Sequence, residues 1–285
     1  MHVTLVARKK GSGVIEAKHR LIQFLRDQAI EFSVDDHPNT LDALESLDQV
    51  STVSLDTVKD GLIVSLGGDG SLLRLIGHAS KHQLPLIGVN LGRVGFLTDL
   101  SMDDLTGLVD ILHGKGHEDK RCLLEVCAES DPTQQLGVAL NDIMICAETP
   151  GKNLDFTVTI DDSHTFSHRA DGFLVSTPTG STAYALSAGG PIIHPDLDVH
   201  LLTPICSHRL STRPLITSPT TKITIKIGAL VNRKAVLCSD GTPLMHLESG
   251  ASIVIHRAQQ QLRMLHPQGY HFFRAAQNKL HWEYA

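Results

Sequence analysis

The stretch that decides the fold runs from Gly61 to Arg74 and reads Gly-Leu-Ile-Val-Ser-Leu-Gly-Gly-Asp-Gly-Ser-Leu-Leu-Arg. The apolar run at 62–66 has the length of a buried strand, and the apolar residues at 72–76 recur at helical spacing. Glycines at 67, 68 and 70 separate the two patterns, which predicts a strand, a tight turn and a helix. Such a turn presents unpaired backbone N–H groups at the start of a helix, where a phosphate can approach closely.

Asp69 is the carboxylate inside this turn. A carboxylate beside a bound phosphate repels it, so we expect Asp69 to have a function of its own. It could orient a hydroxyl group, accept the proton of that group or hold Mg²⁺. Aspartate and glycine are also ordinary turn residues, so a purely structural turn remains the alternative at this point.

The composition is that of an ordinary globular protein. The chain has 285 residues, 41% of them hydrophobic and 20% charged, with a net charge of -6. This length is sufficient for two domains, and the negative charge argues against nucleic acid as a partner. No stretch approaches the ~20 apolar residues of a membrane span. Five cysteines without a Cys-x-x-Cys pair, and an N-terminus unlike a secretory signal, indicate a cytoplasmic protein without a membrane partner.

Strand and helix patterns alternate from residue 1 to 117. We expect strands at 3–7, 32–34, 62–66 and 86–90, and helices at 15–25, at 41–47 and, after a capping box at 101–104, at 105–112. This alternation predicts an α/β domain whose parallel sheet is covered on both faces. A dinucleotide fingerprint is not expected at Gly11-Ser-Gly13, because Glu16 replaces its third glycine.

The pattern changes after residue 117. Apolar residues alternate strictly at 154–160 and 223–227, and short strands are expected near 175 and at 235–237, 253–255 and 262–265. These features predict an all-β domain at 118–267. A helical face returns in the tail at 268–285, which includes Phe273 and Ala276 and is followed by Trp282, and we expect this tail to pack on the first domain.

Two polar stretches stand beside predicted strands. The loop from Asn90 to Asp99 follows a parallel strand, and its glycines and arginine could line the same crevice as the 67–70 turn, because ligands of open α/β sheets bind at the carboxyl ends of the strands. Asn141 and Asp142 stand among apolar strand residues and need polar partners. Ribose hydroxyls would suit both side chains, although a structural loop at the first stretch and an Asx turn at the second are the alternatives.

The third and longest polar stretch is the block from Arg169 to Pro191, rich in hydroxyl groups and glycines. Thr177, Thr179, Ser181 and Thr182 offer hydroxyls, and the aromatic ring at position 184 can lie against a base. The chain contains neither a Gly-x-x-x-x-Gly-Lys-[Ser/Thr] P-loop nor a Gly-x-Ser-x-Gly nucleophile elbow, which argues against a P-loop enzyme and a serine hydrolase.

Together these motifs resemble the NAD kinase family, in the family's order, from residue 64 to the C-terminus. The motifs are the Gly-Gly-Asp-Gly turn, the Gly-x-x-Gly-Phe-Leu loop, Asn141-Asp142, the block at 171–191 and the Leu-Ser-x-Arg-Pro-Leu run at 210–215. The long block is the specific part, whereas the turn is shared with lipid kinases. The resemblance implies a Rossmann-like N-terminal domain, a C-terminal β-sandwich and a homodimer or homotetramer. It further implies phosphoryl transfer from ATP or polyphosphate to the 2′-hydroxyl of the adenosine ribose of NAD, with Mg²⁺ carried by the phosphoryl donor.

The resemblance also implies roles for individual residues. Asp69 corresponds to the general base, with Gly70 beside it, and Arg74 lies one helical turn on, where it could face phosphate. Asn141 and Asp142 match the pair that holds ribose, Asp142 standing where many members have glutamate. Further dinucleotide contacts are implied at Lys152, Arg169, Asp171, Thr182, Ala183, Tyr184, Ala185, Leu186 and Ser187. The sequence Asp240-Gly-Thr242 departs from the Asp-Gly-Gln of many members, which puts a contact there in doubt.

Phosphoryl transfer passes through a loose transition state, so we expect Asp69 to act mainly by orienting the acceptor hydroxyl. Two alternatives stay open. A lipid kinase could use the same turn, but it would need an apolar acyl channel. A non-catalytic dinucleotide sensor would bind the dinucleotide without turnover. The sequence does not decide between ATP and polyphosphate or between NAD and NADH.

Overall fold

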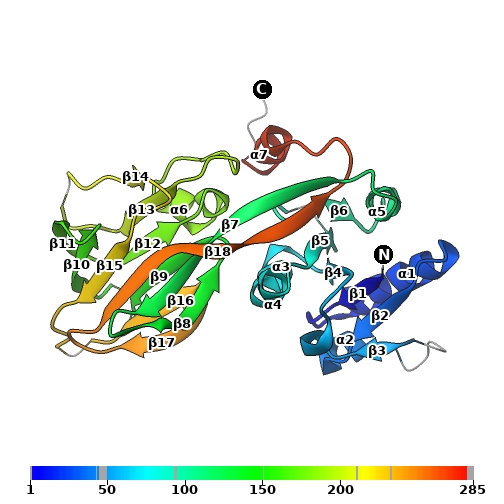
Figure 1. The fold of residues 1–285 in the computed structure, drawn as a ribbon, viewed down its shortest axis with the longest axis horizontal. Helices are drawn as coiled ribbons and strands as arrows, with labels where there is room; N and C mark the ends of the chain where they lie inside the picture. Colours follow the sequence, from blue (N-terminus) through cyan, green and yellow to red (C-terminus); the bar gives the residue numbers. More distant parts are fainter. Residues whose placement is uncertain are drawn as a thin grey trace. The chain divides into compact units, whose positions relative to one another are not determined.

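The computed structural model describes residues 2–42, 44, 50–92, 95–149, 151–209, 211–231 and 233–280. The chain divides into two compact units (Figure 1). Unit 1 comprises the chain up to Lys120 and from Gln261 onward, and unit 2 comprises Arg121–Gln260. Strands β7 (His117–Ala128) and β18 (Ser252–His266) each contribute residues to both units.

Unit 1 is an α/β unit built on parallel strands. Its sheet has the order β5-β4-β1-β2-β3, in which every neighbouring pair is parallel. The short β6 pairs with β5, as does the last part of β18. The strands are β1 (Val3–Val6), β2 (Phe32–Asp35), β3 (Thr52–Val53), β4 (Leu62–Leu66), β5 (Pro85–Asn90) and β6 (Leu100–Ser101). The helices are α1 (Ser12–Asp27), α2 (Pro38–Leu41), a 3-10 turn at Leu55–Thr57, α3 (Asp69–Leu73), α4 (Ile76–Lys81), α5 (Thr106–Leu112) and α7 (Phe272–Leu280). The expected parallel α/β sheet is confirmed.

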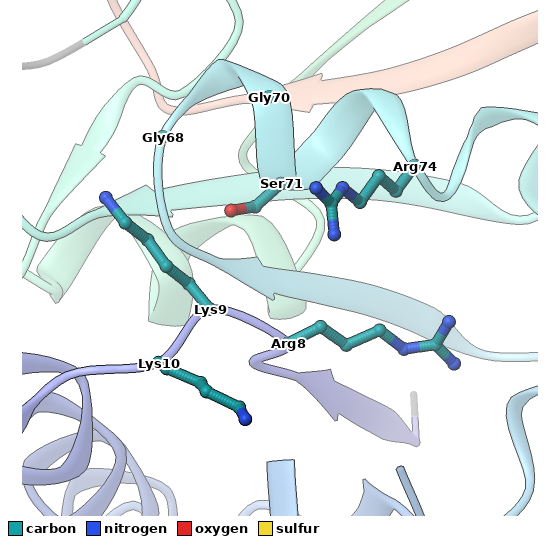
Figure 2. Close-up of a pocket in the computed structure, with 7 residues that line it drawn as sticks. All are labelled: Arg8, Lys9, Lys10, Gly68, Gly70, Ser71 and Arg74. Carbon is teal, nitrogen blue, oxygen red and sulfur yellow. The ribbon is translucent and has the colours of Figure 1, made fainter. Parts of the chain in front are cut away.

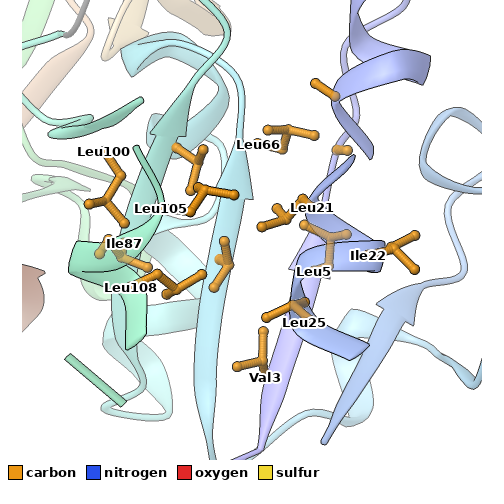
Figure 3. Close-up of a cluster of buried hydrophobic side chains, with 14 of the residues drawn as sticks. Val3, Leu5, Leu21, Ile22, Leu25, Leu66, Ile87, Leu100, Leu105 and Leu108 are labelled. Carbon is orange, nitrogen blue, oxygen red and sulfur yellow. The ribbon is translucent and has the colours of Figure 1, made fainter. Parts of the chain in front are cut away.

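The core of unit 1 lies between the sheet and the helices α1 and α5. Leu21 and Leu25 of α1 pack beside Val3 and Leu5 of β1 (Figure 3), in a cluster that also holds Leu108 of α5. Alternate residues of the same strands, such as Thr4, Ile63 and Ser65, are buried as well. Burial of both sets shows that both faces of the sheet are covered, as the alternation of strands and helices predicts.

Two of the expected helix starts differ in the structure. The helix expected at 41–47 is seen only as α2, which ends at Leu41, and residues 43 and 45–49 lie outside the described residues. The capping box at Ser101 is wrong, because Ser101 belongs to β6 and α5 begins at Thr106. The carboxylate of Asp104 accepts hydrogen bonds from both the backbone N–H and the hydroxyl of Thr106. The side chain that bonds to the start of α5 is therefore Asp104 and not Ser101.

Unit 2 is an antiparallel β-sandwich, as the resemblance implies. One sheet has the order β14-β13-β12-β9-β16-β17, and the other contains β11-β10-β15-β18 with β7 and β8 beside them. The strands are β8 (Asp131–Ala139), β9 (Asp142–Ala147), β10 (Leu154–Ile160), β11 (His164–Ala170), β12 (Gly172–Ser176), β13 (His200–Ile205), β14 (Leu215–Thr217), β15 (Ile223–Ile227), β16 (Ala235–Ser239) and β17 (Thr242–Leu247). A 3-10 helix at Thr179–Thr182 and α6 (Tyr184–Ser187) follow β12.

The two sheets bury the alternating residues that the sequence pattern singles out. Phe156 and Val158 of β10 pack with Ile225 of the neighbouring β15 and Val175 of β12 in one apolar cluster. The two strands expected at 253–255 and 262–265 form one continuous strand, β18. The final helix is α7, and Trp282 lies outside the described residues. Among the described helices, none has the length and apolar character needed to cross a membrane.

Candidate active site

The carboxylate of Asp69 is held by one loop of unit 1. Asp69 begins α3 two glycines after the end of β4, and its Oδ2 accepts the backbone N–H of Phe96 at 2.9 Å. Its Oδ1 accepts the backbone N–H of Leu97 at 3.2 Å and the hydroxyl of Thr98 at 2.9 Å. A carboxylate has about four lone-pair sites. Within the described part of the chain, one site on Oδ2 is therefore open for a further donor.

The glycine at position 95 makes this arrangement possible. A Cβ built on Gly95 would lie 1.8 Å from Oδ1 of Asp69, which no side chain can tolerate. The loop is fixed in turn by Asn90 at the carboxyl end of β5, whose amide donates to the Thr98 hydroxyl at 2.8 Å. The turn at 67–70 and the loop after β5 are thus in direct contact, and the expectation that they line one site stays a prediction.

A basic cavity lies at the same turn. It has a volume of about 440 Å³ and is lined by Arg8, Lys9, Lys10, Gly68, Gly70, Ser71 and Arg74 (Figure 2). A Cβ at Gly68 or Gly70 would meet no protein atom within 4 Å, so packing within the chain does not require glycine at these two positions. Glycine there leaves the backbone open to a phosphate group.

The cations around this cavity are not equivalent. Arg8 makes a two-pronged ion pair with the buried Asp35, with Nε–Oδ2 and Nη2–Oδ1 distances of 2.9 and 3.1 Å, and this partner raises the pKa of the Arg8 guanidinium. Lys9, Lys10 and Arg74 are exposed and have no carboxylate partner in the described part of the chain. These three cations are therefore available to a bound anion.

In unit 2 the carboxylate of Asp240 organises the polar pair at 141–142. It accepts the backbone N–H groups of Leu140, Asn141 and Asp142 at 2.8, 2.7 and 3.1 Å. Asp240 itself has a positive φ of 46°, in the turn between β16 and β17. The Asp240 carboxylate therefore shapes the loop that carries Asn141 and Asp142.

The side chains of Asn141 and Asp142 have no hydrogen-bond partner among the described residues, although Asp142 is 4% exposed. Burial, followed by the charge of Asp240, raises the pKa of Asp142 to about 7. A buried carboxylate without partners is costly, on the order of several kcal/mol. Perturbed carboxyl groups of this kind gather at ligand sites, which fits the expected ribose contact.

Hydroxyl groups of the block from Arg169 to Pro191 make hydrogen bonds within the chain. The hydroxyls of Thr177, Ser181 and Thr182 donate to the carbonyls of Leu140, Pro178 and Thr179, so they hold the block in shape. Gly180 approaches the chain at Asn141 so closely that a Cβ there would lie 2.0 Å from the Asn141 carbonyl oxygen. The block therefore buttresses the 141–142 pair.

In α6, and at Ala183 directly before it, the expected contact residues differ in their exposure to solvent. Tyr184 is 44% exposed and Ser187 is exposed, whereas Ala183 and Leu186 are half-buried. Ala185 is fully buried in a small cluster with Ile193 and Leu201, so its side chain belongs to the core and only the exposed aromatic ring of this helix is free to meet a base.

Arg169, Asp171 and Lys152 form a second group in unit 2. Asp171 accepts the amide of Asn153 at 2.6 Å, the Arg169 Nε lies 3.9 Å from an oxygen of Asp155, and Lys152 is exposed. Strands β9 and β12 pair so that Asp142 lies opposite Ser176 and Cys146 lies opposite Gly172. Asp171 and Asp142 are thus at opposite ends of this pair, roughly 17 Å apart along the strands. The structure does not bring this group beside Asn141 and Asp142 within one chain.

The sequence-based reasoning missed the cations at the end of β1 and the role of Thr98. These cations are Arg8, Lys9 and Lys10. Their signal was position, because they follow a parallel strand at its carboxyl end, where ligands of such sheets bind.

Two family models match this chain. The ATP-NAD kinase N-terminal domain matches residues 3–115, and the ATP-NAD kinase C-terminal domain matches residues 140–266. A NAD kinase of Teredinibacter turnerae is 35% identical over 98% of this chain and 96% of its own length. A NAD kinase of Aromatoleum aromaticum is 37% identical over 98% of this chain and 93% of its own length.

Solved structures agree with the sequence comparisons. Yeast NADH kinase in complex with NADH has a TM-score of 0.89 and 25% identity, and the match covers 100% of this chain and 89% of that one. A NAD kinase from Archaeoglobus fulgidus in complex with ATP has a TM-score of 0.76 and 25% identity, with both chains covered fully. Because both family models and full-length relatives above 30% identity match, this chain belongs to the NAD kinase family.

Proposed function

We propose that this chain phosphorylates NAD on the 2′-hydroxyl of its adenosine ribose, with ATP or polyphosphate as the donor, and so produces NADP. The observation that carries this proposal is the carboxylate of Asp69, which is fixed by three donors and keeps one acceptor site open beside a basic cavity. The full-length family match supports the same reading. It favours a NAD kinase over a lipid kinase or a dinucleotide sensor.

Asp69 orients the acceptor. Its open site on Oδ2 accepts the hydrogen bond of the ribose 2′-hydroxyl and aligns the oxygen of that group with the phosphorus of the donor. The loose transition state leaves the hydroxyl proton in place until late, when the carboxylate receives it. The donors from Phe96, Leu97 and Thr98 stop the carboxylate from rotating away. The Asp69 side chain therefore loses little further conformational entropy when it aligns the hydroxyl group.

The basic cavity receives the donor phosphates. Lys9, Lys10 and Arg74 supply positive charge that offsets the repulsion between Asp69 and an incoming anion. Gly68 and Gly70 let the phosphate oxygens approach the backbone. Ser71 adds a hydroxyl to the same wall (Figure 2).

A divalent metal ion, which we propose to be Mg²⁺, enters with the donor. The described residues that line the basic cavity include no carboxylate, so the chain offers no cage of acidic ligands there. Mg²⁺ commonly binds through substrate phosphates and water with few protein ligands, which fits this donor set. When bound, it would neutralise part of the charge on the phosphates.

In unit 2, Asn141 and Asp142 hold the ribose hydroxyls of the acceptor dinucleotide, and Tyr184 lies against a base. The side chains of the pair have no competing partner among the described residues, and the backbone beneath them is fixed by Asp240. Arg169, Asp171 and Lys152 contact a dinucleotide from the opposite end of β9 and β12. The dinucleotide also contacts Thr182 at the end of the 3-10 helix, Ala183, and Leu186 and Ser187 of α6, and it meets Ala185 through its backbone.

We also propose that the protein is a cytoplasmic homodimer or homotetramer. Edge strands β11 and β14 of the two sheets of unit 2 carry exposed apolar side chains, with Phe166 at 48%, Leu215 at 46% and Ile216 at 47% exposure. An apolar cavity of about 270 Å³, lined by Phe166, Phe173 and Leu215 among others, opens beside them. Uncovered apolar edge strands are typical of surfaces that a second chain covers.

The test is a product assay with the purified chain, Mg²⁺ and NAD, in which ATP and polyphosphate are supplied separately. NADP is measured by its reduction with an NADP-specific dehydrogenase. We expect NADP with at least one donor, at a rate that falls by about 10²–10⁴ in Asp69→Asn. Binding of NAD without turnover would favour a dinucleotide sensor, and phosphate transfer to diacylglycerol or sphingoid bases in place of NAD would favour a lipid kinase.

A further inference from the structure

Outside the candidate active site, a glutamate, a cysteine and a histidine of unit 2 come together on two paired strands. Glu125 and Cys127 lie two residues apart on β7, and His256 lies on β18, which pairs with β7. One potential ligand atom of each residue lies within 4.8 Å of those of the other two. Cys127 is 1% exposed, whereas Glu125 and His256 are half-buried, so the group reaches solvent through these two side chains.

The distance between two ligand atoms of this group suits a small metal ion. The Cys127 Sγ lies 3.7 Å from Oε1 of Glu125. In a tetrahedral zinc site with Zn–S and Zn–O bonds of about 2.3 and 2.1 Å, a sulfur and an oxygen ligand lie about 3.6 Å apart. The thiol and the carboxylate therefore already have nearly the separation that a shared zinc ion requires.

The imidazole of His256 is also prepared for a metal. Its Nδ1 lies 3.0 Å from the backbone carbonyl oxygen of Arg257. A carbonyl oxygen only accepts, so this hydrogen bond requires the proton on Nδ1 and leaves the lone pair of Nε2 available. Metal-binding histidines commonly have their second ring nitrogen fixed in this way.

Two strands of the sandwich hold the three residues in place. Leu124 and Val126 of β7 and Ile255 of β18 point into the core of unit 2, which fixes the strands from the opposite side. The pairing of β7 with β8 shifts register on both sides of Cys127, so this residue lies at an irregularity of the strand. Such bulges turn a side chain out of the regular alternation and often occur next to functional sites.

We propose that Glu125, Cys127 and His256 bind a zinc ion that links β7 to β18, with water in the fourth position. A thiolate and an imidazole select zinc over Mg²⁺ or Ca²⁺, which prefer oxygen ligands. The three residues are not among those that bind the phosphoryl donor or the dinucleotide in the proposed function. The zinc site and the NAD kinase activity can therefore be tested independently.

The experiment uses the full-length, tag-free chain, stripped with a chelator and titrated with Co²⁺ as a spectroscopic substitute for zinc. A thiolate ligand gives an intense sulfur-to-cobalt charge-transfer band in the near ultraviolet. We expect this band in the wild type and its loss when excess Zn²⁺ is added. We expect the band to be absent in Cys127→Ser. It should persist in Cys122→Ser, a matched control because Cys122 lies on the same strand but outside the group of three proposed ligands.

Zinc affinity is measured in parallel by competition with a chromophoric chelator. Replacement of a residue that only supports a metal ligand typically lowers metal affinity tenfold to 100-fold. Glu125 and His256 are proposed as direct ligands, so we expect Glu125→Gln and His256→Gln each to lower zinc affinity by at least about tenfold. Circular dichroism of the metal-free variants reports whether each one folds. If Cys127→Ser does not fold, the affinities of Glu125→Gln and His256→Gln decide the outcome. The proposal is overturned if the wild type shows no charge-transfer band, if Cys127→Ser keeps it, or if both other variants retain wild-type affinity.

Discussion

The substitution Asp69→Asn removes the negative charge of this side chain but keeps its size and one of its oxygens. In Asp69→Asn one oxygen remains to accept from the 96–98 loop, but the amide nitrogen cannot accept a proton. We expect turnover to fall by about 10²–10⁴, the usual contribution of a positioned acid or base, while the Kd for NAD changes little. Initial rates and calorimetric binding measure the two quantities, and thermal unfolding checks the fold. Wild-type turnover in this variant would remove Asp69 from the chemistry.

The buried carboxyl of Asp142 predicts a specific dependence of stability on pH. Its folded pKa is raised to about 7 from 3.8, so between these values the folded chain binds a proton that the unfolded chain has released. Stability therefore falls as pH rises from about 4 to 7, because the unfolded state binds fewer protons. We expect Asp142→Asn to raise the free energy of unfolding at pH 8 by on the order of 2 to 4 kcal/mol, with little effect at pH 4.

Urea denaturation at both pH values measures this change in Asp142→Asn. Glu129→Gln, at an exposed site on the same unit, is the control and should leave stability unchanged at either pH. The same Asp142→Asn variant should bind NAD more weakly, because an amide replaces the carboxylate that accepts from ribose hydroxyls. A variant that is less stable at pH 8 would show that this carboxyl group has partners in the folded chain.

Single residues were predicted from the sequence where their chemistry conflicts with their surroundings. Asp69 among glycines and Asp142 among apolar residues both stand out in this way, and the structure places each at an organised loop. The hydroxyls of Thr177, Ser181 and Thr182 have no such conflict. A hydroxyl can serve a ligand or its own backbone equally well, and only the coordinates show that it donates to nearby carbonyls.

At the scale of elements, the segment after β1 carries three successive cations with different tasks. Lys9 and Lys10 line the basic cavity without carboxylate partners in the described chain, so we expect the double variant Lys9→Gln/Lys10→Gln to raise the KM for the phosphoryl donor. The rise should be roughly tenfold to 100-fold, since a hydrogen bond to a charged group contributes about 1.5 to 3 kcal/mol. The KM for NAD should change little. Steady-state kinetics with each substrate varied in turn measures both constants.

Arg8 provides the contrast to its two neighbours. Its guanidinium pairs with Asp35, whose side chain is fully buried, so Arg8→Met leaves an uncompensated carboxylate in the core. We expect that variant to lose about 2 kcal/mol or more of stability while the donor KM stays near that of the wild type. A large rise in donor KM for Arg8→Met alone, with stability unchanged, would contradict the assignment of tasks along this segment.

Elements were predicted well where the hydrophobic period is strong and poorly where polar residues interrupt it. The strand at 62–66 and the alternating strand at 154–160 are found at the expected bounds. The polar run Gln259-Gln260-Gln261 separates the two strands expected from the sequence. The structure has one strand of 15 residues, β18, which includes this run. Pairing with neighbouring strands along the ladder overrides the local polar signal, and that pairing is not visible in the sequence.

At the scale of the whole molecule, the pattern of domains follows from the change of periodicity after residue 117, because a period of two cannot be accommodated by helices. The separation of Asp142 from Asp171 could not be foreseen. It depends on the register of β9 against β12, in which Asp142 lies opposite Ser176. Register is determined by packing and pairing across the sheet. Two residues expected in one site, such as Asp142 and Asp171, can therefore lie at opposite ends of a strand pair.

The proposed homo-oligomer gives the prediction at this scale. Phe166 on β11 and Leu215 on β14 are 48% and 46% exposed and line one apolar cavity at the edges of the two sheets of unit 2. A carboxylate at both positions would have to be desolvated if a second copy covers them, which is costly. We therefore expect Phe166→Glu/Leu215→Glu to dissociate the oligomer, while Phe166→Tyr, which keeps the aromatic contact, does not. Light scattering coupled to size-exclusion chromatography measures the mass, and circular dichroism confirms the fold. A wild type that is monomeric, or a double variant that keeps the wild-type mass, would show that these edges are not an interface between copies.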